Sequence, residues 1–344
     1  MTTSSRDNQA DRSVPAQRAA PAAGGPPPGR RRLTPATVVA FAALCLIWGS
    51  TYLFIKIGVD YWPPVLFAAV RNLVATVALA LVLTAVALVL RRGWALPGRR
   101  GWVPPAVFAL FQGTAFALIF WAEQYITSGQ TAVLIAANPI ITLPLARFWL
   151  KEPLRRHHYL AVALGVLGVA LVAGTREGSG FTGSAGIRLV AQLAVLVAAF
   201  CYAFSLLYSR RYMRGDKYVN TAIHLGTAGL YLLLLSLVLD PGGGTRVELN
   251  IRSVLALLYL ALLGSALAYW LLFYLIERLG PVEVSYNTLV SPVVAVLLGV
   301  LVLDEPLTWM VVLGTATVAA GSYVVVRPPR SSTTAPPPRS AADR

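Results

Sequence analysis

Residues 64–90 read PVLFAAVRNLVATVALALVLTAVALVL, and Arg71 is the one charged residue among them. An α-helix needs about 20 consecutive apolar residues to cross the hydrocarbon core of a bilayer. Similar apolar runs occur along the rest of the chain, roughly at residues 35–57, 102–123, 127–149, 157–174, 187–209, 219–239, 253–276, 281–303 and 307–327. The sequence therefore predicts an all-α integral membrane protein with ten transmembrane helices.

The composition of the 344-residue chain points the same way. Hydrophobic residues make up 57% of the chain and charged residues 12%, whereas a soluble domain has about 25% charged residues. The net charge of +15 lies in short clusters between the apolar runs and forms no continuous basic face of the kind that binds nucleic acid. We therefore expect the lipid bilayer as the main partner of the chain and no nucleic-acid partner.

The lysines and arginines between the runs indicate an orientation. If the N-terminus is cytoplasmic, the cytoplasmic segments hold most of them, and the outside segments hold only Arg176, Arg188, Arg246 and Arg252. Cytoplasmic loops of membrane proteins are enriched in these residues. We therefore expect a multi-pass protein of the plasma membrane with both termini in the cytoplasm. The excess of arginine over lysine favours a bacterial source.

The membrane region contains an internal repeat. The corner LKEPL at residues 150–154 returns as LDEPL at 303–307, and the same shift of 153 residues places Pro139 on Pro292. Each copy holds five predicted helices, an odd number, so the two copies are inverted relative to each other, as in many secondary transporters. The expected organisation is a disordered tail, two five-helix repeats and a second disordered tail, at residues 1–33, 34–176, 185–327 and 328–344.

The two corners contain the acidic residues Glu152 and Glu305, each followed by a proline. Proline is favoured at the first position of a helix, and a carboxylate is favourable near the positive N-terminal end. We therefore expect each glutamate to face the N-terminus of the helix that follows it.

Several short motifs occur in a fixed order within residues 35–327. They are WGST at 48–51 with Lys56, Pro63-Pro64 with Arg71, EQY at 123–125 with Ser128-Gly129, Pro139, and the two Glu-Pro-Leu corners. With these motifs the chain resembles the EamA-type family of the drug/metabolite transporter superfamily. The resemblance implies ten spans, two repeats, cytoplasmic termini and a central cavity lined by both halves. It also implies export or exchange of small metabolites such as amino acids.

Polar side chains inside a bilayer are costly unless they face protein or a water-filled cavity. We therefore take the polar and aromatic residues that share helix faces as candidate cavity walls. These candidates are Trp48, Tyr52, Arg71, Gln112, Trp121, Glu123, Asn138, Tyr202, Ser205, His224, Trp270, Tyr274, Asn287 and Ser291. For the aromatic residues, packing between helices or a place in the interfacial belt is the alternative.

The ionisable candidates each allow two interpretations. Arg71 either pairs with a substrate carboxylate or with Glu123, or it extends to the interface. Glu123 either binds a substrate amine or a coupling cation, or it contacts water at the outer interface. His224 matches Arg71 at a shift of 153 residues and either responds to protons or packs in the bundle. We expect Lys56 to extend toward the outer interface.

Pro139 and Pro292 lie within the fourth and ninth predicted spans. Because proline has no N–H, the carbonyls of Ile135 and Thr288 need other partners. Beside a cavity such a carbonyl can bind water or substrate. We therefore expect a gating or binding role for the two prolines, with structural kinks as the alternative.

Together these patterns favour a secondary transporter that exports small amino-acid-like or other polar or aromatic metabolites by alternating access. A membrane receptor or binding protein without transport is the alternative. A membrane enzyme is less favoured, because the sequence has no HExxH, GxSxG or Gly-rich phosphate motif. We expect no catalytic residue, no cofactor and no metal site. Small residues in 157–174 and 307–327 favour close helix packing, between the repeats or in a homodimer.

Overall fold

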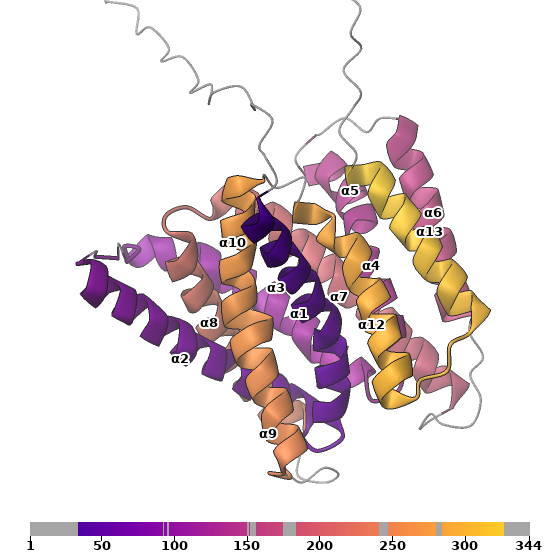
Figure 1. Ribbon diagram of the computed structural model, residues 1–344, viewed down its shortest axis with the longest axis horizontal. Coiled ribbons are helices and arrows are strands. Elements are labelled where there is room, and N and C mark those ends of the chain that lie inside the picture. The colour runs from indigo at the N-terminus through magenta and orange to yellow at the C-terminus, as the bar shows by residue number, and fades with distance from the viewer. Residues whose placement is uncertain are drawn as a thin grey trace, which may run out of the picture. The chain divides into compact units, whose positions relative to one another are not determined.

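The computed structural model describes residues 34–91, 93–94, 96–149, 151, 156–174, 184–240, 247–279 and 284–326. The chain divides into two units, Met1–Arg32 and Leu33–Arg344, and all described residues belong to the second. In the described part of the chain every regular element is a helix (Figure 1). In chain order they are α1 (Pro35–Val59), α2 (Pro64–Leu90), η1 (Arg99–Trp102), α3 (Val103–Ala122), α4 (Ser128–Ala136), α5 (Asn138–Trp149), α6 (Arg156–Ala173), α7 (Ala185–Tyr212), α8 (Lys217–Leu239), α9 (Ile251–Leu258), η2 (Tyr259–Leu267), α10 (Ala268–Arg278), α12 (Asn287–Leu303) and α13 (Trp309–Val326).

Eight helical segments are long and apolar enough to cross a bilayer. They are α1, α2, η1 with α3, α4 with α5, α6, α7, α8, and the continuous run of α9, η2 and α10. The helix α12 and the apolar part of α13, Trp309–Val324, are shorter. The expected all-α chain with membrane-capable helices is therefore confirmed, whereas the count of ten spans stays a prediction.

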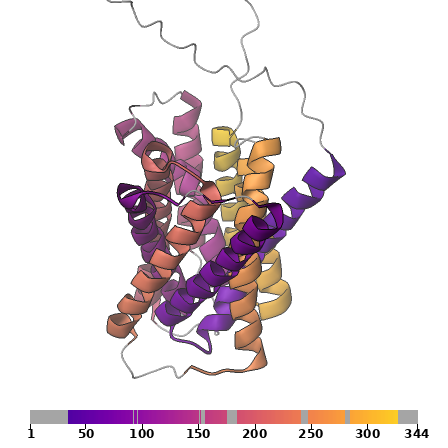
Figure 2. The ribbon, with the colours of Figure 1, turned by 90° about the vertical axis from the view of Figure 1, so that its left-hand side faces the viewer.

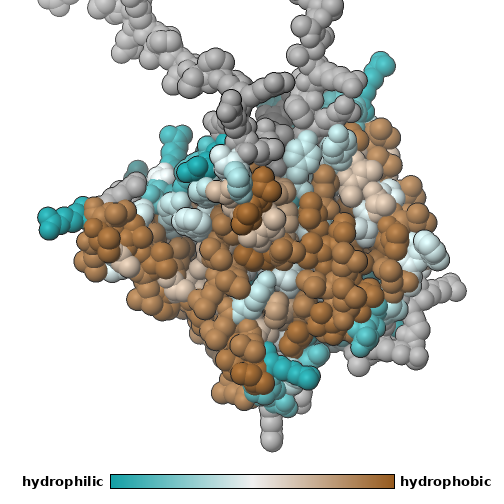
Figure 3. All heavy atoms as spheres, viewed as in Figure 1, coloured by the Kyte–Doolittle hydropathy of each residue, from teal (hydrophilic) through white to brown (hydrophobic). Residues whose placement is uncertain are grey.

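The flanks of the helices carry large apolar side chains on their surface. Leu88, Val89 and Leu237, for example, are 75%, 79% and 72% exposed. Figure 3 shows hydrophobic residues over the middle of this face and hydrophilic residues toward its upper and lower edges. Soluble monomeric proteins rarely expose apolar patches of this extent. The distribution is the one expected of helices that face lipid.

Helices from the first and second halves of the chain pack against one another. The helix α2 lies beside α8 (Figure 2), and α6 lies beside α13. The helix α1 packs on α12, and α7 packs on α3, α4 and α5. The helix α4 also contacts α12. The two halves are therefore interleaved and do not form separate domains.

Two ends of the bundle are distinguished by the connections they hold. The lower end in Figure 1 holds the turn between α1 and α2 and the connection between α12 and α13. The upper end holds the start of α1 and the end of α13. The largest cluster of buried apolar residues includes Val59, Phe67, Phe120 and Leu257. These residues belong to the ends of α1 and α3 and the starts of α2 and the α9 segment, so an apolar core fills the lower end.

The contact between α6 and α13 depends on glycine. A Cβ atom on Gly168 would lie 2.6 Å from Val318 Cγ2 and 2.9 Å from the backbone oxygen of Gly314. Small residues of this kind let membrane helices approach closely. The fifth and tenth predicted spans therefore pack against each other within one chain, while Ala316 and Ala320 stay exposed.

The fourth predicted span is divided at its proline. The helix α4 ends at Ala136, and α5 begins at Asn138 with Pro139 as its second residue. Proline is tolerated there because the first N–H groups of a helix have no partner within it. The Ala136 carbonyl accepts a hydrogen bond from the Ser322 hydroxyl of α13 at 3.2 Å. Pro292, by contrast, lies inside the continuous helix α12, so the two prolines that match in sequence differ in structure.

Candidate binding cavity

A cavity of about 450 Å³ lies among helices from both halves of the chain. This volume is within the range of small-molecule sites, about 300–1,000 Å³. Ten of the residues singled out in the sequence line it: Trp48, Tyr52, Arg71, Gln112, Asn138, Tyr202, Ser205, Asn287, Ser291 and Pro292. The helix faces chosen from the sequence thus meet around one space.

Arg71 is the charged residue of the described cavity lining. It lies two turns into α2, about 10 Å from Pro64 along the helix axis at 1.5 Å per residue, and it is only 5% exposed. Its guanidinium lies over the ring of Phe116 at 4.6 Å from the ring centroid. Among the described residues it forms no ion pair, so the expected pairing with Glu123 is not present.

A π-helical segment provides the polar contacts of Arg71. In η2 the hydrogen bonds join residues five apart, and the segment lies beside α2. Arg71 Nε donates to the Leu260 carbonyl at 3.5 Å, and a terminal nitrogen, Nη2, donates to the Ser265 hydroxyl at 3.3 Å. Ser265 in turn donates to the same carbonyl at 3.0 Å. Arg71 therefore crosses from the first half of the chain to the second through long, neutral contacts.

Aromatic residues form much of the remaining wall. Tyr269 accepts a hydrogen bond from Gln112 Nε2 at 2.9 Å and meets Trp48 edge to face at 6.5 Å between ring centroids. Tyr202 meets Phe116 edge to face at 6.1 Å. Tyrosine and tryptophan offer flat apolar surface together with a polar group. The wall can therefore contact an apolar ligand body while keeping a few polar atoms in fixed positions.

Two buried amide side chains of the lining are incompletely bonded. Asn287 Nδ2 and Gln112 Oε1 have no hydrogen-bond partner within the described part of the chain. Asn138 differs, because its Nδ2 donates to the Ala199 carbonyl at 3.0 Å. Buried polar atoms are normally satisfied. Asn287 and Gln112 therefore each keep one buried polar atom without a described partner in the wall of the cavity.

Several lining residues were not among the candidates from the sequence. They include Thr51, Phe108, Phe116, Gly264, Tyr269 and Thr288. Phe116 shares a helix face with Gln112, so helical periodicity contains a signal for it. Tyr269 follows the polar Ser265 by four residues, but the π-helical segment η2 before it changes the helical phase that this spacing would give.

Six of the predicted residues lie outside the cavity lining: Trp121, Glu123, Pro139, His224, Trp270 and Tyr274. Trp121 packs on Tyr125 with ring centroids 5.1 Å apart. Trp270 is 48% exposed and stacks on Tyr274 at 5.6 Å. The π-helical turn that precedes α10 sets which face of that helix points inward, and this face carries Tyr269 in place of Trp270.

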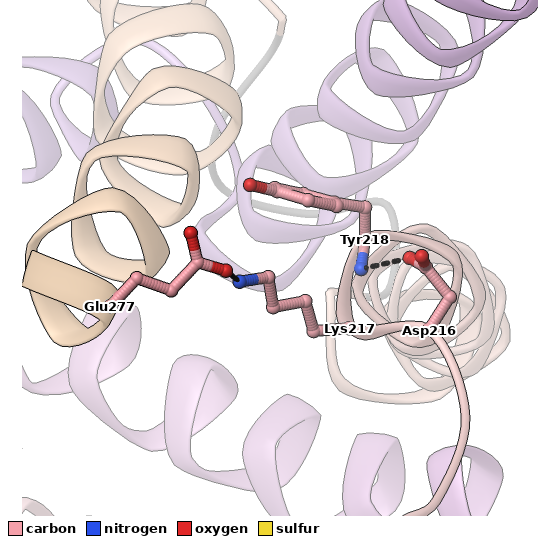
Figure 4. Close-up of polar contacts among 4 residues, drawn as sticks. All are labelled: Asp216, Lys217, Tyr218 and Glu277. Atoms are coloured by element: carbon pink, nitrogen blue, oxygen red, sulfur yellow. Dashed lines mark hydrogen bonds and ion pairs between the residues drawn. The ribbon is translucent and has the colours of Figure 1, made fainter. Parts of the chain in front are cut away.

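The upper end of α10 makes a separate polar contact with α8. Figure 4 shows Lys217 and Glu277 forming an ion pair, while the Asp216 carboxylate accepts from the Tyr218 N–H at 2.8 Å. Asp216 thereby caps the start of α8, as short polar residues often do. Glu277 shares a helix face with Tyr274, yet it binds Lys217 and not the cavity.

His224 lies behind the cavity wall and is 3% exposed. Its ring contacts Phe108 at 5.0 Å and Tyr269 at 5.5 Å between centroids, both edge to face. Neither ring nitrogen has a hydrogen-bond partner among the described residues. Phe108 and Tyr269 therefore lie between His224 and the cavity, and a ligand in the cavity would not contact His224 directly.

Lys56 and Glu123 meet at the lower end of the bundle. The Lys56 ammonium donates to the backbone carbonyls of Glu123 and, at 3.3 Å, of Ile126. Carbonyls at a helix C-terminus attract cations, which explains why Lys56 turns toward the end of α3 and does not extend outward. Glu123 is 0% exposed, and neither carboxylate oxygen has a partner in the described residues. Glu123 therefore lies below the surface of the described structure.

Glu305 reaches the same lower-end region from the second half of the chain. One carboxylate oxygen accepts from the Ser128 N–H at 2.8 Å, and the other accepts from the Ser128 hydroxyl at 2.9 Å and the Gly129 N–H at 3.3 Å. Glu305 thus faces the N-terminus of α4, and the expectation that it faces the following helix is wrong. The reason is local: Asp304 has φ of +53°, which turns the chain back, and Gly299 has no side chain to block the carboxylate. Glu152 lies outside the described residues.

Among the described residues, no group of three or more His, Cys, Asp or Glu side chains lies close enough to hold a metal ion. The arrangement instead combines a buried cation, aromatic walls and amide groups in one cavity. Such a site can bind and orient a small organic molecule.

Comparison with known proteins gives consistent similarities. The chain matches the EamA-like transporter family over residues 36–174 and 189–327. It is 31% identical over 300 residues to the uncharacterized inner membrane transporter YedA of Escherichia coli strain K12, covering 84% of this chain and 92% of that protein. It is 26% identical over 297 residues to a Salmonella typhimurium strain LT2 protein named "Probable amino-acid metabolite efflux pump", covering 82% and 91%. A solved crystal structure with 19% identity and a TM-score of 0.57 shares the fold over 84% of this chain and 96% of that one.

Proposed function

The chain belongs to the EamA-like transporter family, and from this premise we propose that it exports small metabolites by alternating access around the Arg71 cavity. It is a membrane transporter, and the comparisons indicate transport rather than enzymatic catalysis. The observation that carries the proposal is the cavity itself. It is built from both halves of the chain and contains a buried charge that the described fold leaves unpaired.

Alternating access needs two similar units that move against each other, and the packing supports two inverted five-helix repeats. Inversion requires that helices in one half have counterparts with matching partners in the other. The contact of α1 with α12 corresponds to the contact of α7 with α4 and α5. The pairs of α2 with α8, α4 with α12 and α6 with α13 each join a helix to its own counterpart. We therefore retain ten spans and the inverted repeat.

The proposed orientation places the upper end in the cytoplasm of a bacterial cell. The start of α1 and the end of α13 lie at this same end (Figure 1), which supports an even number of spans. The arginine-rich segments predicted to be cytoplasmic connect helices there. A relative named as an inner membrane transporter supports a location in the cell membrane.

The packing at the lower end supports access from the cytoplasm in this state. The lining reaches Asn287, the first residue of α12, toward the upper end. At the lower end the apolar core and the contact of Glu305 with α4 join the two halves. Opening to the outside then requires release of Glu305 from Ser128 and Gly129.

Export of a small metabolite is supported by the Salmonella relative, whose name describes amino-acid metabolite efflux. A homodimer is a further proposal. Because the glycines of α6 and α13 face each other within one chain, a second copy would have to contact the exposed side of α13 at Ala316 and Ala320.

Uptake into inside-out membrane vesicles tests the proposal. Vesicles with and without the protein are given a mixed metabolite pool, with and without a pH gradient, and their contents are measured by mass spectrometry. Accumulation of particular compounds only with the protein is the expected result. Binding of a compound by the purified protein without any flux would favour the receptor alternative, and conversion of a compound would favour an enzyme.

A further inference from the structure

The described lining of the cavity contains a positive charge and no negative charge. Arg71 is the charged residue among its described lining residues. The acidic residue that is fully buried in the described part of the chain is Glu123, and it lies outside the lining, beside Lys56. The cavity therefore presents a cation to a ligand and offers no described carboxylate in return.

The surroundings of Arg71 are incomplete for a buried cation. Its contacts are one carbonyl at 3.5 Å, one hydroxyl at 3.3 Å and the faces of Phe116 and, at 5.7 Å from the ring centroid, Phe120. A guanidinium has five N–H donors, and taking an unpaired ion out of water costs several kcal/mol even after relaxation. A ligand carboxylate can supply two parallel acceptors to such a fork. The missing counter-charge is thus of the kind that an organic acid provides.

The rest of the wall selects the body of the ligand. Trp48, Tyr202, Phe116 and Tyr269 supply aromatic faces and edges. Asn287 and Gln112 add amide side chains to the lining, which suit one or two neutral polar groups. An ammonium group would lose its hydration without gaining a carboxylate partner, and it would be repelled by Arg71.

Resting on the proposed transport function, we infer that the cavity takes a small organic monocarboxylate with an aromatic or other apolar body, in preference to a zwitterionic amino acid or an amine. Arg71 binds the carboxylate, and the aromatic wall contacts the body. Discrimination against the zwitterion comes from its ammonium group, which has no acidic partner in the described lining.

Three probes that share a phenylethyl body test this inference: 3-phenylpropanoate, phenylalanine and phenethylamine. Their binding to the purified full-length protein is measured by calorimetry, and their exchange is measured in proteoliposomes beside protein-free liposomes. We expect 3-phenylpropanoate to bind at least about tenfold more tightly than either other probe, a difference of about 1.4 kcal/mol. It should also exchange fastest.

Variants at Arg71 connect the preference to the residue. Arg71→Gln should weaken binding of 3-phenylpropanoate at least about tenfold and remove the discrimination among the probes. Arg71→Lys keeps the charge without the planar fork, and its affinity for 3-phenylpropanoate should lie between those of the unchanged protein and Arg71→Gln. Arg252→Gln, a change of an exposed arginine at the start of α9, is the matched control and should leave binding unchanged. If Arg71→Gln does not fold, the order of the three probes in affinity for the unchanged protein still tests the inferred preference.

Equal or tighter binding of phenylalanine or phenethylamine, an unchanged preference in Arg71→Gln, or no binding of any probe at millimolar concentration would each overturn the inference. If the protein exchanges phenylalanine or phenethylamine but does not exchange 3-phenylpropanoate, the inferred substrate class is wrong and the proposed transport function stands. Tight binding of 3-phenylpropanoate, with no exchange of any probe and no vesicle uptake of the metabolite pool, removes transport and leaves the binding preference.

Discussion

Arg71 and Glu305 are both charged residues that reach from one half of the chain to the other, yet the fold treats them differently. Glu305 accepts two backbone N–H groups and a hydroxyl at the N-terminus of α4, at 2.8 to 3.3 Å. Arg71 has two long neutral contacts and an aromatic face. A charge that the fold satisfies holds two elements together, whereas a charge that it leaves unsatisfied is available to a ligand. The predictions below test this difference.

The largest expected effect is the loss of transport in Arg71→Leu. Removing the cation should reduce flux of the native substrate by about 100-fold, in line with the cost of truncating one partner of a buried charge pair. The unfolding temperature in detergent should hold or rise, because an unpaired buried charge is replaced by an apolar side chain. A clear fall in the unfolding temperature would show instead that Arg71 supports the fold.

For Glu305→Ala we expect a loss of stability, because the change should weaken the contact between α12 and α4. Hydrogen bonds to a charged group contribute about 1.5–3 kcal/mol, and the half-exposed position of Glu305 favours the lower value. We expect a lower unfolding temperature and roughly tenfold faster labelling of a cysteine at Ser128 from the outside, measured with a membrane-impermeant maleimide. Glu305→Gln keeps acceptor atoms and should show a smaller change. Unchanged labelling in both variants would contradict a closing role for this contact.

A smaller effect compares two adjacent aromatic residues. Tyr269→Ala removes a cavity wall and the acceptor of Gln112, and it should reduce flux about tenfold, since aromatic contacts contribute about 0.5–1.5 kcal/mol beyond their buried area. Trp270→Ala changes an exposed residue and should leave flux within about twofold, in keeping with the small effects of most surface substitutions. Equal losses of flux in the two variants would contradict the assignment of Tyr269 to the inward face of α10.

The smallest expected effect concerns a second carboxylate at a helix N-terminus. Asp240 accepts from the Leu66 N–H of α2 at 2.9 Å, at a helix start where Pro63 offers no side-chain cap. Asp240→Ala should lower stability by about 1 kcal/mol, with flux retained, as measured by thermal unfolding and vesicle uptake. Asp240→Asn keeps an acceptor and should be nearly neutral. A clear loss of flux in Asp240→Ala would contradict a role for Asp240 that is limited to capping α2.

The helices follow closely from the sequence because the bilayer imposes a simple rule. The run quoted at residues 64–90 coincides with α2, since an uninterrupted apolar segment has no alternative to a helix in lipid. Much of the cavity also follows, because polar residues such as Asn287 and Gln112 stand out in apolar surroundings. The sequence therefore predicts well where the helices lie and which of their faces carry polar residues.

The features that the sequence does not convey depend on backbone geometry and distant contacts. The π-helical segment η2 changes the helical phase before Tyr269, so the inward position of Tyr269 does not follow from an α-helical spacing. Pro139 and Pro292 match in sequence, yet α13 supplies a hydrogen bond only at the break beside Pro139. Asp304 adopts a left-handed conformation, as Lys151 does at the matching corner, but the sequence does not show that the carboxylate of Glu305 then reaches α4.

Two-sided access to the cavity tests the central claim most directly. Thr288, a half-buried residue of the lining, is replaced by cysteine after Cys45 and Cys201 are replaced by serine. A membrane-impermeant maleimide is then applied to either side of oriented vesicles. Alternating access predicts labelling from each side and protection by a transported compound. Labelling from one side only, with and without that compound, would contradict it.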